Sequence, residues 1–153
     1  MWIKNVDFPK KIIIFVIQCL IINNFDFGRI KFTQALHGSS NNDGQYMGDP
    51  AGVIVTMQGR KIYHCGDTGI FGDMKLIGEL DKIDVMLVPI GGNFTMDVDD
   101  AVKAVNMVNP RLAIPIHYNT FPVIQAAPQE FVKKVEALGI QAKEMQYNEE
   151  ISI

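Results

Sequence analysis

The sequence of this 153-residue chain predicts a layered α/β domain in which strands and helices alternate. Short apolar runs bounded by glycine, proline and asparagine are typical of strands, and two longer stretches repeat apolar residues at helical spacing. Hydrophobic residues make up 48% of the chain and charged residues 20%, which argues against a disordered chain. The length is that of one domain, and no repeat, linker or low-complexity tract divides it.

The first 24 residues form a divergent apolar segment that differs from the rest. Lys10 and Lys11 precede an apolar run over residues 12–22, which resembles the start of a signal peptide. The run is too short to span a bilayer as a helix, which takes about 20 residues, and no small-residue cleavage site follows it. Its β-branched residues favour a buried strand. A membrane or export segment, and a sequence with no role in the native fold, are the two alternatives.

Three strands are expected in the next part of the chain. Residues 28–37 place apolar side chains on alternate faces, which predicts a half-buried strand ending at His37. Residues 52–57 are expected to form a second strand, joined by only two residues to a third over 60–65, which is typical of a β-hairpin. This hairpin leads directly into Asp67.

Three helices are expected from apolar residues that recur on one face. The clearest covers residues 98–108, with Asp97 as its N-cap and Asn109 followed by a proline as its end. A shorter helix is expected over residues 71–80, weakened by its glycines. The third begins at Pro128, ends at Gly139 and carries one apolar stripe. The stripe consists of Phe131, Val132, Val135 and Leu138.

Two further strands and a closing segment complete the pattern. Residues 84–90 and 112–116 are almost continuously apolar, as expected of strands covered on both faces of a sheet. Pro115 lies inside the second run and indicates an edge position or a bulge, because proline cannot donate a ladder hydrogen bond. Residues 140–153 are expected to form one or two closing strands.

Charge and cysteine content exclude several classes of function. The net charge is -3 and no run of Lys or Arg occurs, so neither a nucleic acid nor an anionic membrane surface is an expected partner. Cys19 and Cys65 are the only cysteines and form no CxxC pair, which argues against a disulfide framework. A reducing cytoplasm is the expected location.

Three potential metal ligands follow predicted strands. His37 and His117 each come directly after an apolar run, and Asp67 follows the hairpin between Gly66 and Gly69. Metal ions are bound by imidazole and carboxylate groups presented from rigid elements into one pocket, so the three residues are interpreted as one metal site. The alternative is that each residue caps a strand or bonds within a loop.

The third histidine and the second cysteine are interpreted differently. His64 lies inside a predicted strand and is expected to be packed or hydrogen-bonded near the site rather than to bind the metal. Cys65 is expected to be a small buried hydrophobic residue, because a reactive thiol needs a lowered pKa.

The order of these motifs resembles the C-terminal half of a metallo-β-lactamase-fold hydrolase. The chain carries HGSS at 37–40, HCGDTG at 64–69, LVPIGG at 87–92 and PIHY at 115–118. This combination is similar to the bacterial metal-dependent hydrolases related to ascorbate-phosphate lactonases. The resemblance covers residues 25–153 and implies half of an αββα sandwich, preceded by the divergent segment 1–24.

The resemblance also implies roles for the candidate ligands. His37 corresponds to a ligand of a first metal, Asp67 to the carboxylate that bridges two metals, and His117 to a ligand of the second metal. Zinc is the expected ion, with manganese and iron as alternatives. Two such ions make hydroxide available at neutral pH, which would attack a small-molecule ester, lactone or phosphoester at a site where Asp67 and His117 are the catalytic residues. The sequence leaves open whether the protein forms a homo-oligomer.

One departure from the family pattern affects the expected activity. The leading family signature, His-x-His-x-Asp-His, has no counterpart in this sequence, and no histidine precedes His37. We therefore expect a truncated hydrolase that is weakly active or inactive alone. The rival hypothesis, from a different class, is a non-catalytic remnant of the fold or an interaction module.

Overall fold

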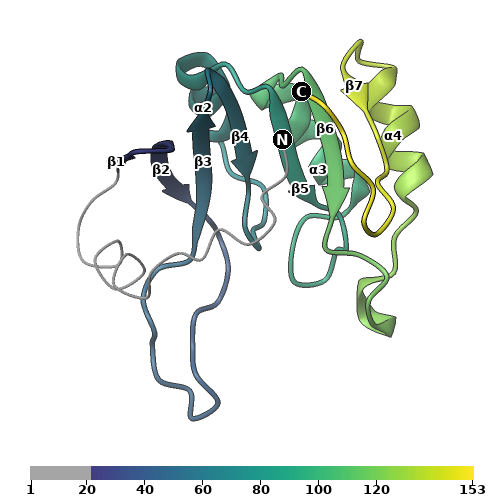
Figure 1. Cartoon of the computed structure of the whole chain (residues 1–153). Helices are drawn as coiled ribbons and strands as arrows, with labels where there is room; N and C mark the ends of the chain where they lie inside the picture. Colours follow the sequence, from purple (N-terminus) through teal and green to yellow (C-terminus); the bar gives the residue numbers. More distant parts are fainter. Residues whose placement is uncertain (1–21) are drawn as a thin grey trace.

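The computed structural model describes residues 22–153 and contains one sheet of seven strands. The strands are neighbours in the order in which they follow along the chain (Figure 1). They are β1 (Ile22–Phe25), β2 (Gly28–Gln34), β3 (Ala51–Met57), β4 (Arg60–His64), β5 (Val85–Pro89), β6 (Leu112–Ile116) and β7 (Gln141–Ala142). The first four strands pair antiparallel and the last four parallel.

Three α-helices and one short 3-10 helix connect the parallel part of the sheet. They are α2 (Met74–Asp81), α3 (Val98–Val108), η1 (Pro122–Ile124) and α4 (Pro128–Glu136). The α-helices lie together behind the sheet in Figure 1, with α3 packed between α2 and α4. This is the arrangement expected of parallel strands, whose crossover connections place helices on a sheet face.

The main hydrophobic core lies between these helices and one face of the sheet. Ile54, Tyr63, Met86 and Ala113 are register partners across four strands, and all four are buried. Helix residues such as Phe131 complete the cluster. The predicted α/β layering is therefore confirmed.

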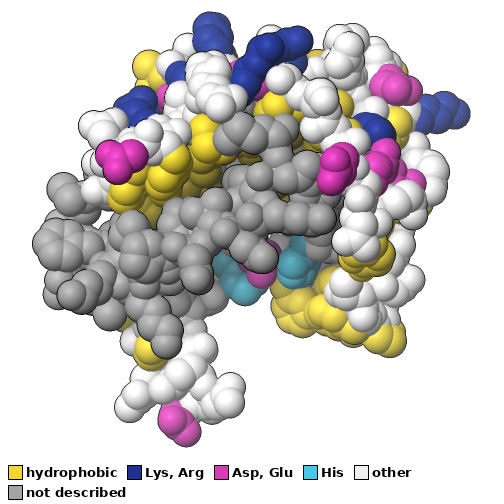
Figure 2. Space-filling model, in the orientation of Figure 1, with side chains coloured by type: hydrophobic (Ala, Val, Ile, Leu, Met, Phe, Trp, Pro, Cys, Tyr) yellow, Lys and Arg dark blue, Asp and Glu magenta, His cyan; other side chains and the backbone are white. Residues whose placement is uncertain are grey.

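The opposite face of the sheet is also apolar. Val53, His64, Leu87 and Ile114 are register partners along a row on that face, and none belongs to the main core cluster. Figure 2 looks onto the molecule in the orientation of Figure 1 and shows hydrophobic side chains on this side. The prediction that the parallel strands are apolar on both faces holds.

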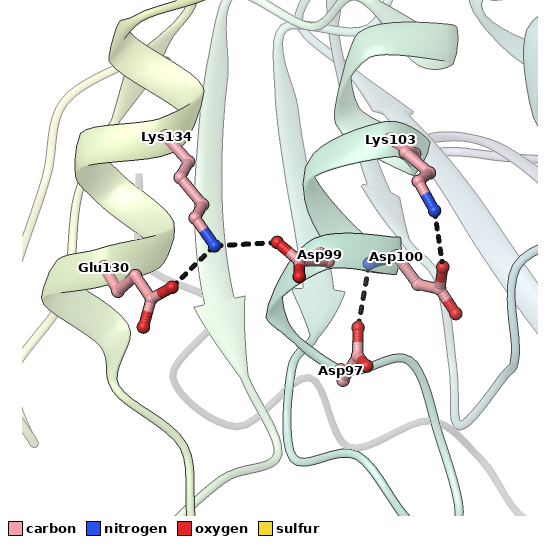
Figure 3. A network of polar contacts seen from close by, with 6 residues as sticks. All are labelled: Asp97, Asp99, Asp100, Lys103, Glu130 and Lys134. Carbon is pink, nitrogen blue, oxygen red and sulfur yellow. Dashed lines mark hydrogen bonds and ion pairs between the residues drawn. The ribbon is translucent and has the colours of Figure 1, made fainter.

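Helix α3 forms where the sequence predicts it because both of its ends carry strong local signals. The Asp97 carboxylate accepts a hydrogen bond from the Asp100 backbone N–H at 2.9 Å, which satisfies one of the free donors of the first turn (Figure 3). Asn109 adopts a left-handed conformation at the other end. Lys134 of α4 bonds to Asp99 of α3 at 2.7 Å, linking the two helices.

A buried carboxylate joins α2 to strands β2 and β4. This contact lies at the opposite end of the sheet from the loops that carry Asp67 and His117. Asp81 is only 4% exposed and accepts bonds from Lys31 of β2 at 2.5 Å and Lys61 of β4 at 3.2 Å. Burial raises the pKa of Asp81, but the two lysines outweigh it and hold that pKa below its usual value. The group therefore stabilises the fold as a carboxylate.

Several predicted boundaries differ from the structure. Strand β2 ends at Gln34, three residues before His37, because its pairing with β3 ends there. Helix α2 begins at Met74 rather than 71, after a turn in which Met74 N–H bonds to the Phe71 carbonyl. Leu138 lies beyond α4 and is 45% exposed, so it does not continue the apolar stripe. The closing segment contributes only β7.

Pro115 lies in an interior strand, but at its position only one neighbouring strand pairs with it. It pairs with Val88 of β5, while the pairing of β6 with β7 covers only Leu112 and Ala113. On that side Pro115 is in effect at an edge, as predicted.

The N-terminal predictions fall mostly outside the described residues. Residues 22–24 of the segment expected to be divergent lie in β1, which pairs with β2. The remainder of the apolar run at 12–22 lies outside residues 22–153, and its role stays a prediction. Within residues 22–153, no helix combines the length and apolarity needed to cross a membrane.

Candidate metal site

Asp67 lies on a tight turn directly after β4. Gly66 has a φ of 72°, and a Cβ atom at this position would lie 2.7 Å from the Ala51 carbonyl oxygen. Only glycine fits that approach, as the sequence pattern indicates. The turn is also closed by His64, whose Nδ1 accepts a hydrogen bond from the Gly66 N–H at 3.0 Å.

His64 has the hydrogen-bonding role that the sequence predicts for it. With Nδ1 accepting from Gly66, the ring proton of neutral His64 lies on Nε2. Burial lowers the pKa of His64, while the charge of Asp67 opposes this shift. Cys65 is fully buried in the core, and burial raises the pKa of its thiol, so the expectation of a packed, unreactive cysteine is confirmed.

His117 is the first residue after β6 and has an unusual backbone conformation. Its φ is 54°, in the left-handed region that non-glycine residues seldom adopt and that occurs most often at functional positions. Gly91 allows this conformation, because a Cβ atom there would lie 2.4 Å from the His117 carbonyl oxygen. The Asn119 side chain holds the following turn through two bonds to the backbone of Ala126, at 2.8 and 3.1 Å.

The structure brings Asp67 and His117 together. The distance from Asp67 Oδ2 to His117 Nε2 is 3.4 Å, and the side chains are 48% and 27% exposed. His117 Nδ1 is buried and has no hydrogen-bond partner among the described residues. A carboxylate oxygen and an imidazole nitrogen this close, and reachable from solvent, are suited to bind the same cation.

His37 lies on a segment that is fixed against the Asp67 turn. Its Nδ1 lies 2.8 Å from the Gly38 carbonyl oxygen, an arrangement that leaves Nε2 for a ligand. The preceding residue, Leu36, accepts a bond from the Gly69 N–H at 2.9 Å. His37 therefore follows a residue that is bonded to the loop carrying Asp67.

Thr68 also connects the His37 segment to the Asp67 turn. The sequence did not identify it as a site residue. It is completely buried, and its hydroxyl accepts a bond from the Leu36 N–H at 2.8 Å and donates to the Gly69 carbonyl at 2.7 Å. Its own carbonyl accepts from the Met96 N–H at 3.0 Å. Only its place beside Asp67 could have drawn attention to it, because its partners Leu36 and Met96 are distant in sequence.

The described residues fit part of a metal site. Figure 2 shows histidine side chains on either side of a carboxylate in a hollow of this face. Oxygen and nitrogen donors suit zinc, manganese and iron. Across residues 22–153, however, no three His, Cys, Asp or Glu side chains form a group that could hold an ion. The structure thus pairs Asp67 with His117 and does not add His37 as a third member.

Comparison with known proteins identifies the family. A family model described as a beta-lactamase superfamily domain matches residues 17–118, well over half of the chain. The chain belongs to this family. The matched stretch of the beta-lactamase superfamily domain contains His37, Asp67 and His117.

Curated relatives agree with this assignment. A protein of Carboxydothermus hydrogenoformans, named UPF0173 metal-dependent hydrolase, is 53% identical over 123 residues, which are 78% of this chain and 54% of the relative. A protein of the same name from Bacillus cereus is 51% identical over 119 residues, 74% of this chain and 52% of the relative. The chain spans about half the length of the curated relatives it matches.

Solved structures show the same fold. Igni18, a metallo hydrolase from Ignicoccus hospitalis, is 43% identical with a TM-score of 0.69, over 77% of this chain and 49% of that chain. An isothiocyanate hydrolase from Delia radicum gut bacteria matches with a TM-score of 0.69 at 18% identity, over 88% and 58% of the two chains, and supports the fold alone. The predicted metallo-β-lactamase fold is confirmed.

Proposed function

We propose that this chain carries part of the active site of a metal-dependent hydrolase and that Asp67 and His117 bind its metal. The observation that carries the proposal is the 3.4 Å approach of Asp67 Oδ2 to His117 Nε2 at adjoining loops of the sheet. The names of the curated relatives, all metal-dependent hydrolases, support the same chemistry.

His37 is proposed as a third ligand, although the structure does not group its side chain with the Asp67–His117 pair. Its Nε2 makes no hydrogen bond to the described residues, and its segment is tied to the Asp67 turn through Leu36 and Thr68. A divalent cation held by these groups, zinc as the first expectation and two ions by family resemblance, would lower the pKa of a bound water and polarise an ester, lactone or phosphoester. Asp67 and His117 would then orient the ion and, through it, the substrate.

The proposed substrate is a small molecule, with neither a nucleic acid nor a membrane as partner. The proposal also includes a homo-oligomer as a possible working form of the protein. Because the chain covers about half of its relatives, weak activity of the isolated chain is the expected result.

One observation favours a second candidate, a non-catalytic interaction module that retains the fold. Within residues 22–153, no three His, Cys, Asp or Glu side chains are grouped closely enough to hold an ion. A module of this kind would fold without metal and hydrolyse nothing.

Metal content and hydrolysis together distinguish the two candidates. The purified 153-residue chain is expected to retain a divalent metal and to hydrolyse a generic lactone or phosphodiester slowly. The Asp67→Ala variant should lose both the metal and the hydrolysis, because one of two adjacent ligands is removed.

Asp73→Ala is the matched control for that experiment. Asp73 lies in the same connection as Asp67, and its side chain makes no capping bond to α2. The control should keep the metal content of the wild type. A folded wild-type chain without metal and without activity would favour the interaction module.

A further inference from the structure

We infer that the part of the substrate beyond the scissile bond is uncharged and apolar. This inference rests on the proposed hydrolytic function and narrows its substrate class. Its basis is the composition of four connections at one end of the sheet, which we call the site loops. The site loops are residues 35–50, 65–73, 90–97 and 117–127.

The site loops contact one another around Asp67 and His117. Gly69 N–H bonds to the Leu36 carbonyl at 2.9 Å, which joins the first two loops. Met96 N–H bonds to the Thr68 carbonyl at 3.0 Å, which joins the second and third. The third and fourth touch where Gly91 leaves no room for a Cβ atom beside the His117 carbonyl. A substrate bound at Asp67 and His117 would therefore lie against these loops.

The site loops contain no lysine or arginine. Every Lys and Arg among residues 22–153 lies outside them, and the face in Figure 2 shows Lys and Arg side chains only in its upper half. The loops carry five carboxylates, Asp43, Asp49, Asp67, Asp73 and Asp97. A metal ion would attract the reacting group itself, but a second anionic group on the substrate would find no cationic side chain in the site loops to receive it.

Two cavities lie beside the candidate ligands His37 and His117 and have the same character. One, of about 880 Å³, lies beside His37 and includes Phe32, Leu36 and Asp49 in its wall. The other, of about 620 Å³, lies beside His117 and includes Ile116 and Glu144. Among residues 22–153, neither is lined by a lysine or arginine, and each has one carboxylate among largely apolar walls, the usual lining of a pocket for an apolar ligand.

The site loops also expose large hydrophobic side chains. Six of them are at least 45% exposed, and all come from loops that follow β2, β5 or β6. They are Leu36, Tyr46, Met47, Phe94, Phe121 and Val123. Apolar side chains left open to water on the loops that carry a polar site are suited to cover the apolar part of a ligand.

The test compares ligands that differ only in charge or length. The p-nitroanilides of butyrate and succinate have acyl chains of equal length, and the second replaces a methyl with a carboxylate. Binding to the full chain is measured by shifts of backbone amide NMR signals in the site loops. We expect the succinyl compound to bind on the order of tenfold more weakly. Lengthening acetyl to butyryl to hexanoyl should tighten binding by up to about fourfold per methylene.

A matched pair of variants tests whether the site loops contact the acyl chain of the ligand. Phe121→Ala should weaken binding of the hexanoyl compound and leave the acetyl compound unchanged. Leu138→Ala removes an equally exposed side chain outside the site loops, since both residues are 45% exposed, and should change neither.

Hydrolysis of the corresponding p-nitrophenyl esters separates this inference from the proposed function. Equal or tighter binding of the succinyl compound, or affinity that does not change with chain length, would overturn the inference even if esters are hydrolysed. Absence of both bound metal and hydrolysis, with the apolar preference intact, would overturn the proposed function alone.

Discussion

Thr68 is the residue on which the geometry of the candidate site depends most directly. Its buried hydroxyl satisfies both the Leu36 N–H and the Gly69 carbonyl. Thr68→Val keeps the shape of the side chain but leaves these two groups unpaired, which costs about 1–3 kcal/mol of folding free energy. We expect a loss in this range by urea unfolding, whereas Thr68→Ser should retain most of the stability.

Thr95→Val provides the comparison for that measurement. The Thr95 hydroxyl makes one longer contact, 3.4 Å to the Met96 carbonyl, and is only half-buried. An equal loss of stability in the Thr68→Val and Thr95→Val variants would show that the Thr68 hydroxyl has no special role.

His64 gives the fold a pH dependence whose sign follows from its environment. Burial lowers the pKa of His64 below its ordinary value of 6.5, so the unfolded chain binds this proton more readily than the folded chain. The contribution to stability is complete above pH 6.5 and is lost as the pH falls toward the folded pKa. The free energy of unfolding should therefore decrease as the pH falls below 6.5.

The variant His64→Gln tests the assignment, because it removes the titrating group. Its free energy of unfolding should depend less on pH over the same interval. A slope identical to that of the wild type would mean that other groups cause the dependence.

At the scale of the element, α3 is stabilised more by its cap than by its surface ion pairs. Asp97→Ala removes the bond to the Asp100 N–H and should cost about 1 kcal/mol, within the range of 0.5–2 kcal/mol for such caps. Lys134→Met removes two exposed ion pairs, to Asp99 and Glu130, and should have a smaller effect because water screens exposed pairs. Thermal unfolding of both variants gives the comparison, and the reverse order would contradict this account.

Local signals explain which elements could be predicted from the sequence. The bounds of α3 and β6 agree with prediction because Asp97 and Asn109 mark the helix ends and the strand is short and apolar. The end of β2 could not be predicted, because its alternation continues to Leu36 although Leu36 bonds to Gly69 and Thr68 instead of β3.

The candidate site was predictable to a similar extent and for similar reasons. Strand ends and flanking glycines pointed to Asp67 and His117, which the structure pairs. The contribution of Thr68 depends in part on Leu36, which lies 32 residues away in the sequence, and no local pattern reveals such a contact. The position of His37 relative to the pair is likewise set by tertiary contacts.

At the scale of the whole molecule, the buried Asp81 ion pairs and the candidate ligands lie at opposite ends of the sheet. The Asp81 ion pairs join α2, β2 and β4 at one end, while the site loops join the other ends of β2, β4, β5 and β6. A ligand that holds two site loops together restrains strands from both the antiparallel and the parallel part of the sheet. Binding at Asp67 and His117 should therefore stabilise the whole domain rather than one loop.

Metal binding should accordingly raise the free energy of unfolding of the full chain. A ligand that binds only the folded state adds about 2.7 kcal/mol at a concentration of 100 times its Kd. We expect the unfolding temperature to rise as zinc or manganese is added to the metal-depleted chain. The Asp67→Ala and His117→Ala variants should lose this increase, since each lacks one partner of the 3.4 Å pair, and Asp73→Ala should keep it. An equal increase in the wild type and in all three variants would mean that the metal binds at a site other than Asp67 and His117. A bound ligand stabilises the fold only through the site that it occupies.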